Sequence, residues 1–295
     1  MRIGIDLGGT KIEGVVMDEH SKILARYRVS TPQNDYHATL AAIVGLVNQL
    51  ESGQEACSVG IAHPGSLSPR NGLMRNANST CLNGQPVKDD LQALLQREIR
   101  MANDANCFTL SEASDGAAAH ASSAFGVIIG TGCGGGLVVN RAIPASANGI
   151  SGEWGHNPLP WPNADWDEVP GPSCWHGLPG CLETWLSGPA LSRDHGGTMS
   201  VEEISKAAEN GSTAAEASLK RYEHRLARSL ATVINLLDPQ VIVLGGGLSN
   251  LIRLYSNVPP LWGEWVFSDS CETQLLPASH GDSSGVRGAA WLWEA

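Results

Sequence analysis

The chain has 295 residues, of which 42% are hydrophobic, and its 19 basic and 30 acidic residues give a formal net charge of −11. Nucleic acids and anionic membranes bind clustered Lys and Arg, so this charge balance argues against either as a main partner. The length predicts about two domains.

The N-terminal run Met1–Asp6 enters a strand-like pattern directly, without an apolar signal segment. No stretch has the roughly 18 consecutive apolar residues of a membrane span. Seven scattered cysteines fit reduced thiols better than a disulfide framework. We therefore expect a cytoplasmic protein.

The first glycine turn lies between two strand patterns, 2–7 and 12–17, which predicts a hairpin. Amides at Gly8 and Gly9, the hydroxyl of Thr10 and the ammonium of Lys11 form a plausible phosphate cradle, and Asp6 can hold Mg²⁺ through water. An ordinary Gly-Gly hairpin turn is the alternative.

A strand at 23–30 and a helix at about 35–51 come next, followed by a buried strand at 58–62. Pro64 and Gly65 force a turn at the carboxyl end of that strand, where ligands of open α/β sheets collect. We interpret His63 as a loop histidine.

Residues 76–80 and 82–84 form a polar loop of amides and hydroxyls, the type of surface that reads sugar hydroxyls. A helix at 87–96 and a short strand at 99–102 lead to Asn103 and Asp104, which open an alanine-rich helix predicted to reach about residue 119. Asp104 is either the N-cap of that helix or a carboxylate that takes a proton from an attacking hydroxyl. The sequence permits both roles.

A second glycine turn, at 130–136, follows a strand at 125–129 and contains G-x-G-x-x-G. That motif binds dinucleotides only when it opens a helix. Here a second strand follows at 137–140, so we expect another hairpin. The units 1–17 and 125–139 thus look like repeats of one phosphate-gripping device, which suggests two related domains closing on one nucleotide.

The segment 152–183 combines many turn-forming residues with four candidate ligands: His156, Cys174, His176 and Cys181. Two thiols and two imidazoles meet the needs of a tetrahedral zinc site. A disulfide between Cys174 and Cys181 is the lesser alternative. Five tryptophans, at 154, 161, 166, 175 and 185, suggest a rigid platform under or beside this loop.

The C-terminal part predicts helices at 182–194, 200–209 and 213–237, a strand at 241–244, a glycine turn at 245–249 that admits a flat ligand, and a strand at 271–277. A final helix to Trp293 is expected to return to the first domain. The predicted boundaries are a small α/β lobe at 1–118, completed by 284–295, and a large α/β lobe at 119–283 that carries the metal loop 152–183.

With these runs in view, the chain resembles the ROK family of bacterial sugar kinases over its whole length. The most specific matches are Asp6-Leu-Gly-Gly-Thr-Lys11, Asn103-Asp104-Ala-Asn, Gly152-Glu-Trp-Gly-His156, the loop ending in Gly-Cys181-Leu-Glu183, and Leu244-Gly-Gly-Gly247. The resemblance implies an α/β, actin/hexokinase-like (ribonuclease H-like), two-lobed ATPase fold with a zinc-binding loop. Within the family the chain looks most like fructokinases that also accept mannose, because of 76–80, 155–161 and 280–291.

The resemblance also implies roles. Asp104 would be the general base. The substrate-binding set would be Gly65, Asn78, Asn103, Asp104, Glu153, His156 and Glu183. ATP and Mg²⁺ would be held by Asp6, Gly8, Gly9, Thr10, Lys11, Gly130, Thr131, Gly132, Cys133, Gly134, Gly246, Gly247 and Ser249. Zn²⁺ would be bound by His156, Cys174, His176 and Cys181.

Three positions depart from the family pattern. His176 stands where a second cysteine is common, Cys81 where tryptophan is usual, and His63 and Ala62 replace an apolar residue and a glycine. His176 affects the expected affinity for zinc, whereas Cys81, His63 and Ala62 affect which sugar is expected to bind.

The expected reaction is ATP-dependent conversion of D-fructose to fructose 6-phosphate, with mannose also possible. The alternatives are a glucokinase, an N-acetylglucosamine or N-acetylmannosamine kinase of the same family, and an inactive sugar-binding regulator. Regulators of the family carry an N-terminal DNA-binding module, whereas here the phosphate hairpin begins at Met1. The expected partners are a hexose and ATP, with no nucleic acid and no membrane, in a homodimer.

Overall fold

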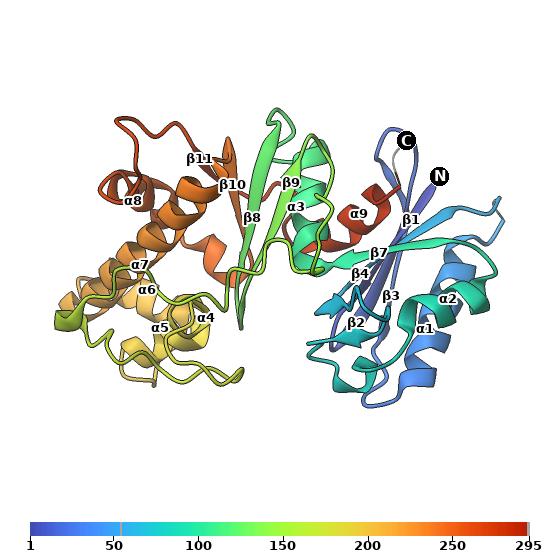
Figure 1. Cartoon of the computed structure of the whole chain (residues 1–295), viewed down its shortest axis with the longest axis horizontal. Coiled ribbons are helices and arrows are strands. Elements are labelled where there is room, and N and C mark those ends of the chain that lie inside the picture. Colours follow the sequence, from blue (N-terminus) through green and yellow to red (C-terminus); the bar gives the residue numbers. More distant parts are fainter. Residues whose placement is uncertain (54, 294–295) are drawn as a thin grey trace. The chain divides into compact units, whose positions relative to one another are not determined.

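The structure is a computed structural model that describes residues 1–53 and 55–293 (Figure 1). Its contacts divide the chain into two compact units. Unit 1 comprises Met1–His120, Gly136–Ser151 and Ser279–Ala295, and unit 2 comprises Ala121–Gly135 and Gly152–Ala278.

Unit 1 is built on a five-stranded sheet in the order β3-β2-β1-β4-β7. Its strands are β1 (Arg2–Leu7), β2 (Lys11–Met17), β3 (Ile23–Ser30), β4 (Ser58–His63) and β7 (Ile99–Asn103). β1 and β2 form the antiparallel hairpin expected around the first glycine turn, whereas β1, β4 and β7 run parallel. The carboxyl ends of these three strands therefore meet at one edge, where Asp6, His63 and Asn103 lie.

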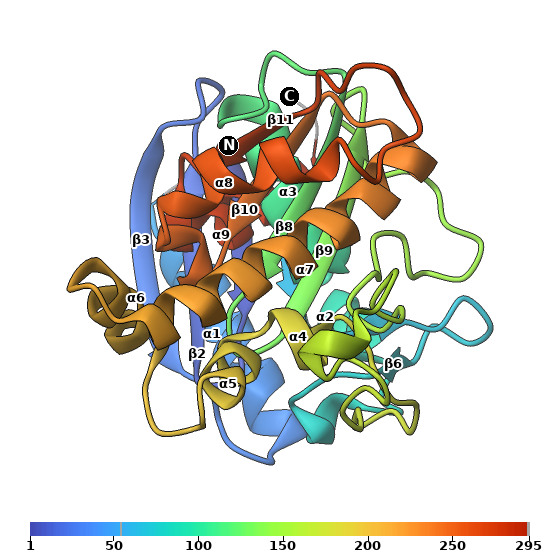
Figure 2. The same cartoon turned by 90° about the vertical axis from the view of Figure 1, so that its left-hand side faces the viewer.

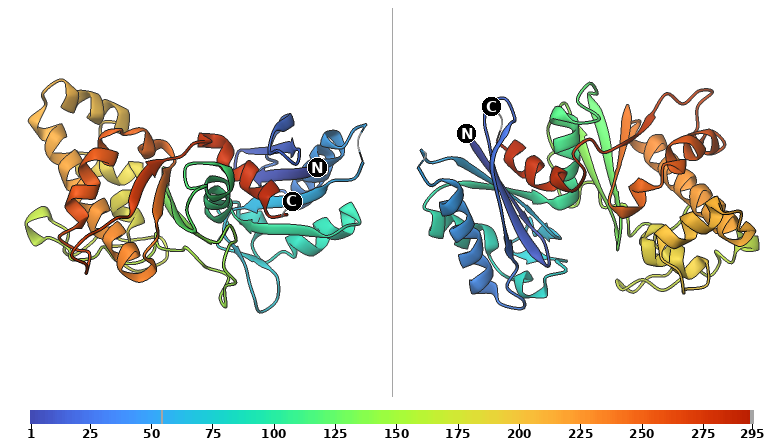
Figure 3. Two further views of the ribbon diagram at one scale, coloured as in Figure 1. Left: turned by 90° about the horizontal axis from the view of Figure 1, so that it is seen from above. Right: turned by 180° about the vertical axis from the view of Figure 1, so that it is seen from behind.

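Helices cover both faces of this sheet. α1 (Tyr36–Leu50) and α2 (Val87–Leu95) bury their apolar sides on one face, together with Ile3 and Ile5 of β1. α3 (Asp104–Asp115) and α9 (Ser284–Trp291) cover the other, and Figure 3 shows α9 running beside β1. α9 lies so close to β4 that a side chain at Gly60 would collide with the Ala289 carbonyl, so glycine is required there.

One interpretation for unit 1 is wrong, and one of the two alternatives for Asp104 is excluded. His63 is not a loop residue: it is the last residue of β4 and only 2% exposed, because its ring is packed at the sheet edge with Nδ1 3.1 Å from the Pro64 carbonyl. Asp104 is not the N-cap of α3; Asn103 is, since its side chain accepts hydrogen bonds from the amides of Ala105 and Asn106.

The helix α3 also ends earlier than predicted, at Asp115 rather than near residue 119. Gly116 has φ −109° and ψ −147°, which is not helical. The Glu112 carboxylate accepts a hydrogen bond from the Ala117 amide at 2.9 Å and thereby offers that amide an alternative to the helix. The short elements of unit 1 are β5 (Ser66–Leu67), β6 (Met74–Arg75), η1 (Thr80–Leu82) and η4 (Gly281–Ser283).

Unit 2 contains most of a sheet in the order β11-β10-β8-β9. Its strands are β8 (Ser123–Ile129), β9 (Cys133–Val139), β10 (Val241–Gly245) and β11 (Gln274–Pro277). The second glycine turn leads from β8 into β9, a strand, which confirms the expected hairpin and excludes the dinucleotide interpretation. β9 begins four residues earlier than predicted, and its last residues belong to unit 1.

The helices of unit 2 are α4 (Glu183–Leu186), α5 (Gly188–Asp194), α6 (Val201–Glu209), α7 (Thr213–Leu237) and α8 (Arg253–Trp262), with η2 (Ala164–Trp166) and η3 (Gly247–Asn250). Figure 2 shows α7 as the long helix of the unit, with α8 beside it. The single helix predicted at 182–194 is two helices, because Ser187 is extended at ψ 162° and caps α5. α8 was not predicted, and β11 is shorter than the predicted strand at 271–277.

All seven cysteines are free thiols, so the alternative of a Cys174–Cys181 disulfide is not realised. Within the described part of the chain, no helix has the length and apolarity that crossing a membrane requires.

Candidate functional site

The predicted site residues fall into two sets. Unit 1 holds Asp6, Gly8, Gly9, Thr10, Lys11, Gly65, Asn78, Asn103 and Asp104. Unit 2 holds Gly130, Thr131, Gly132, Cys133, Gly134, Glu153, His156, Cys174, His176, Cys181, Glu183, Gly246, Gly247 and Ser249. Each set is organised within its own unit.

The first glycine turn of unit 1 is closed by its backbone and by residues that follow β3. The Gly8 amide donates to the Lys11 carbonyl at 3.0 Å. Thr31 Oγ1 donates to the Gly8 carbonyl at 2.7 Å, and Gln33 Nε2 donates to the Gly9 carbonyl at 2.9 Å. The sequence analysis missed these two side chains; the antiparallel pairing of β2 and β3 brings the end of β3 beside the turn.

A buried carboxylate pairs with three cations beside this turn. The Glu13 side chain is 2% exposed and lies 3.8 Å from Lys11 Nζ and 2.6 Å from Arg28 Nε, and it also pairs with Arg26. The Lys11 side chain itself is 49% exposed. A half-exposed ammonium group at the end of a glycine turn suits an anionic ligand.

Asp6, at the end of β1, carries a strongly perturbed carboxyl group. Burial raises its pKa to about 6, and the negative charges of Asp104 and Glu13 add to the effect, while Lys11 opposes it. A Cβ added at Gly285, in α9, would lie 3.1 Å from Asp6 Oδ2, so this carboxyl group is pressed against the helix. Such a group gains from a nearby divalent cation, and its hard oxygens are the ligands that Mg²⁺ prefers.

Asn103 and Asp104 lie where β7 turns into α3. Asn103 Oδ1 accepts from the Ala105 amide at 3.0 Å, and its Nδ2 donates to the Gly65 carbonyl at 3.0 Å. Asp104 is exposed at the first residue of the helix, and its Oδ1 accepts from the Ala105 amide at 2.8 Å. The Asn103 side chain thus joins the start of α3 to the turn after β4 and fixes the backbone that presents Asp104.

Asn78 lines a small pocket of about 120 Å³ in unit 1. Gly9 and Thr31 of the glycine-turn region also line it, as does Thr80. The polar loop predicted to read sugar hydroxyls therefore lies against the first glycine turn. One member of that loop, Asn83, has a structural role, since its side chain makes two hydrogen bonds with the backbone of Ala77, at 2.9 and 3.0 Å.

In unit 2, the two glycine turns lie side by side. β8 and β10 are parallel neighbours, so the turns after Ile129 and after Gly245 occupy the same edge of the sheet. Gly246 has φ +81°, and a side chain there would collide with the Ile129 carbonyl, so only glycine allows this approach. Ser249 Oγ donates to the Gly246 carbonyl at 2.6 Å, which closes the second turn. The edge leaves a glycine-lined surface that a flat ligand can approach.

The run Gly152–His156 packs directly against the start of β9. Trp154 Nε1 donates to the Gly134 carbonyl at 2.9 Å, and the Trp154 ring meets Phe125 edge-on at 5.8 Å. A side chain at Gly155 would collide with the Cys133 carbonyl. The glycine turn and the residues that lead to His156 therefore form one rigid assembly.

Two glutamates belong to this assembly. Glu183 Oε2 accepts from the Cys133 amide at 3.2 Å, and its Oε1 accepts from Trp175 Nε1 at 3.2 Å. Burial raises the pKa of Glu153, with His156 opposing and Glu183 reinforcing the rise. The structure thus brings together, within unit 2, the three residues predicted there for sugar binding.

The four predicted metal ligands converge. The ligand atoms of His156, Cys174, His176 and Cys181 all lie within 4.8 Å of one another. Cys174 Sγ is 3.6 Å from His156 Nδ1, and Cys181 Sγ is 3.5 Å from His176 Nδ1. Zinc–sulfur bonds of about 2.3 Å and zinc–nitrogen bonds of about 2.05 Å at tetrahedral angles separate sulfur and nitrogen by about 3.6 Å. The donor set and its spacing fit a four-coordinate zinc ion.

A buried ionic network supports the loop before these ligands. Glu168, 3% exposed, accepts from Arg225 Nε at 2.8 Å and from Arg228 Nη2 at 2.9 Å. Arg225 also pairs with Asp194 at 2.7 Å, and Asp194 pairs with Arg221 at 2.7 Å. These contacts fix the tryptophan-rich loop to α7.

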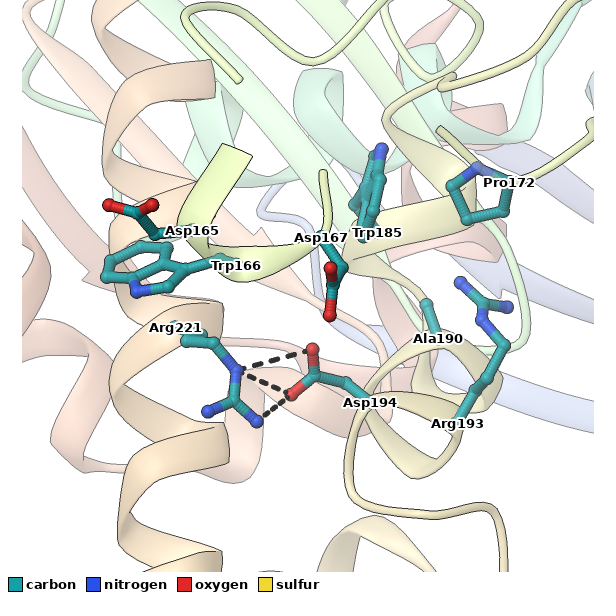
Figure 4. A pocket seen from close by; sticks show the side chains of 9 residues that line it. All are labelled: Asp165, Trp166, Asp167, Pro172, Trp185, Ala190, Arg193, Asp194 and Arg221. Carbon is teal, nitrogen blue, oxygen red and sulfur yellow. Dashed lines mark hydrogen bonds and ion pairs between the residues drawn. The ribbon is translucent and has the colours of Figure 1, made fainter. Parts of the chain in front are cut away.

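Figure 4 shows a pocket of about 470 Å³ beside this network, with the Arg221–Asp194 pair on one wall and Trp166 and Trp185 among its lining residues. None of its lining residues is one predicted for substrate, nucleotide or metal. The pocket is distinct from both sets of predicted site residues.

Two sheets of this topology, each with a glycine-turn hairpin and helices alongside, define an actin/hexokinase-like α/β protein. A sequence model of the ROK family matches residues 2–295. The chain therefore belongs to the ROK family, and the predicted fold class is confirmed.

Similar proteins place the chain among sugar kinases. An N-acetyl-D-glucosamine kinase of Vibrio atlanticus is 38% identical over 301 residues, covering 99% of both chains. A ROK hexokinase from Thermus thermophilus superposes with a TM-score of 0.85 at 28% identity, covering 98% of this chain and 96% of that one. A ROK family glucokinase from Streptomyces griseus, solved in complex with glucose and AMPPNP, gives 0.78 at 27%, covering 99% and 98%.

Proposed function

We propose that the protein transfers the terminal phosphoryl group of ATP to a hexose, with N-acetyl-D-glucosamine as the first candidate. The 38% identical relative, which matches end to end, bears that name, whereas the sequence runs had suggested fructose. None of the three proteins just described is named for fructose. We therefore propose N-acetylglucosamine, which the sequence analysis gave as an alternative, in place of fructose. Fructose is one of the sugars to be tested.

The observation that carries the proposal is Asp104, an exposed carboxylate at the first residue of α3 and at the same sheet edge as Asp6. Phosphoryl transfer needs alignment and charge neutralisation more than covalent help. In the proposed reaction Asp104 accepts the proton of the attacking hydroxyl. Asp6 would help to hold Mg²⁺, which when bound would supply positive charge to offset that of the phosphates.

We assign roles to the remaining predicted residues from the chemistry of their side chains and backbone amides. Gly65, Asn78 and Asn103 of unit 1, and Glu153, His156 and Glu183 of unit 2, are proposed to contact the sugar. The turn at 8–11 and the turn at 130–134 are proposed to hold the phosphates through amides, Thr10, Thr131 and Lys11. Gly246, Gly247 and Ser249 are proposed to face the adenosine.

Zinc is proposed to have a structural role. It would be held by His156 Nδ1, Cys174, His176 and Cys181, and when bound it would fix a loop that connects two proposed sugar contacts, His156 and Glu183. With four protein ligands, no position is left for water or substrate, so the ion supplies order rather than chemistry. Protein purified without chelator is expected to contain about one zinc per chain.

The test is a coupled ADP-release assay with N-acetylglucosamine, N-acetylmannosamine, glucose, mannose and fructose. N-acetylglucosamine should give the highest kcat/KM. Turnover only with fructose would restore the original expectation, and no turnover with any sugar would defeat the proposal.

Asp104→Asn tests the base. We expect kcat to fall by at least about 100-fold, because general base catalysis typically contributes that much or more, while nucleotide affinity stays near wild type. Asp89→Asn is the matched control, since Asp89 is an exposed aspartate in the first turn of another helix of unit 1. Wild-type turnover in Asp104→Asn would reject the assignment.

A further inference from the structure

Trp175 occupies the position between two of the metal ligands, Cys174 and His176. Its side chain is 68% exposed, yet it makes three directed contacts. Its ring meets the His156 ring edge-on, with centroids 5.1 Å apart and planes at 89°. Its Nε1 donates to Glu183 Oε1 at 3.2 Å. Its ring also meets the His176 ring edge-on, with centroids 6.3 Å apart. The indole therefore contacts two proposed metal ligands, His156 and His176, and the proposed sugar contact Glu183.

The Glu183 carboxylate is held at both oxygens. Oε2 accepts from the Cys133 amide in the glycine-turn hairpin, and Oε1 accepts from Trp175. A Cβ added at Gly132 would lie 2.8 Å from Oε2, so the carboxylate is also pressed against the turn. With either hydrogen bond removed, the flexible glutamate side chain regains rotamer freedom.

The backbone of Trp175 has few ways to move when its neighbours are ligands of one ion. The loop is short, since the Cys174 amide donates to the Leu178 carbonyl at 3.1 Å and the Gly177 amide donates to the Cys174 carbonyl at 3.0 Å. Fixing Cys174 and His176 on an ion fixes the residue between them. The direction of the indole N–H is thus set by the metal loop.

We propose that Trp175 is a positioning residue that transmits the order of the metal loop to Glu183, and so sets the affinity for the sugar. The inference rests on the proposed function for the identity of the ligand. The hydrogen bond from Trp175 to Glu183 does not depend on that function. The side chains that Trp175 contacts are His156, His176 and Glu183, two of which are proposed sugar contacts, so its effect is expected on sugar binding.

The first experiment is steady-state kinetics of Trp175→Phe, which keeps a ring against His156 but removes the N–H donor. We expect the sugar KM to rise about 3- to 10-fold, the usual effect of losing one hydrogen bond, with kcat within about twofold and the ATP KM unchanged. Trp161→Phe is the matched control, because Trp161 is also half-exposed and on the same loop segment but packs on Trp265 instead.

A double-mutant cycle with Glu183→Ala, which removes the acceptor of the Trp175 hydrogen bond, distinguishes action through Glu183 from a general loosening of the loop. If Trp175 acts through Glu183, the substitution Trp175→Phe has a smaller effect on the sugar KM in the Glu183→Ala background. Full additivity, or a rise in KM equal to that of Trp161→Phe, would overturn the inference.

The second experiment does not depend on turnover. In protein labelled with ¹⁵N at the indoles, the Trp175 Nε1–H resonance is the one lost in Trp175→Phe. Chelation of the metal is expected to shift this resonance and to speed its exchange with water at least about 10-fold, as expected when a hydrogen bond opens. An unchanged resonance after metal removal would refute the coupling. Absence of turnover with every sugar would instead defeat the proposed function and leave this measurement standing.

Discussion

The carboxyl group of Asp6 should make the ligand-free protein less stable at neutral pH than it would be with a neutral residue there. Its pKa is raised from 3.8 to about 6, first by burial and then by Asp104 and Glu13. Because the folded-state pKa lies above the unfolded value, the penalty is absent below about pH 3.8 and complete above about pH 6. The difference corresponds to up to about 3 kcal/mol at pH 8 and about half of that at pH 5.

Asp6→Asn removes the ionisable group while keeping its shape. We therefore expect the variant, without Mg²⁺ or nucleotide, to unfold at higher urea concentration than wild type, with a gain of up to about 3 kcal/mol at pH 8 that shrinks toward pH 5. In the same variant kcat should fall sharply, because the proposed Mg²⁺ contact is lost. The residue would then be an example of function maintained at a cost in stability.

The assay is urea denaturation followed by tryptophan fluorescence at pH 5 and pH 8, with Asp89→Asn as the control. Asp89 is exposed, so its substitution should change the free energy of unfolding by less than about 0.5 kcal/mol at either pH. A variant Asp6→Asn that is no more stable than wild type at pH 8, or a gain that is independent of pH, would contradict the assignment of a raised pKa.

Two further perturbations test the metal loop and its support. Cys181→Ser should lower the zinc content below half an equivalent and raise the sugar KM, measured by metal analysis and kinetics, because a hydroxyl is a poor substitute for a thiolate; unchanged zinc would count against a four-ligand site. Glu168→Gln should destabilise the protein by about 3 kcal/mol or more in urea denaturation, since it leaves the buried Arg225 and Arg228 without their shared carboxylate, whereas the exposed Glu202→Gln should have little effect. A small loss in Glu168→Gln would mean that the arginines find other compensation.

The strands and most helices could be predicted because their signals are local. The glycine turns, the period of the apolar residues and the caps at Asp35 and Ser212 each depend on a few neighbouring residues, and the observed bounds of α1 and α7 follow them. The metal cluster was also accessible, since its four ligands lie within a short, turn-rich stretch and the structure brings them together.

Errors arose where a distant contact overrides a local pattern. α8 contains Pro259 and Pro260, which forbid a helix on local rules, yet it packs on α7 through Leu254 and Val258, both fully buried. The break at Ser187 follows from a hydrogen bond between the Gly188 amide and the Gly130 carbonyl, at 2.7 Å, far away in sequence. Periodicity carries no information about either contact.

The choice of sugar is the part least accessible to sequence, for a related reason. Hexoses differ in the placement of single hydroxyl or acetamido groups, and discrimination depends on how far a few polar groups are held in place. In unit 2 the Glu183 carboxylate, a proposed sugar contact, is held in place by its hydrogen bonds from Trp175 Nε1 and the Cys133 amide. Short motifs such as 76–80 report that amides and hydroxyls are present but not how they are aimed, so they favoured fructose where whole-chain similarity favours N-acetylglucosamine.

The same reasoning gives the proposed zinc ion a role that needs no zinc chemistry. Glu183 begins α4, two residues after the proposed ligand Cys181, and the Glu183 amide donates to the Gly155 carbonyl at 2.9 Å, next to the proposed ligand His156. One ion at this point would fix two chain segments, around His156 and around Cys181, that both lead to proposed sugar contacts. A loop with this many glycines has a high conformational entropy to lose on ordering, and the free energy of metal binding would offset that loss.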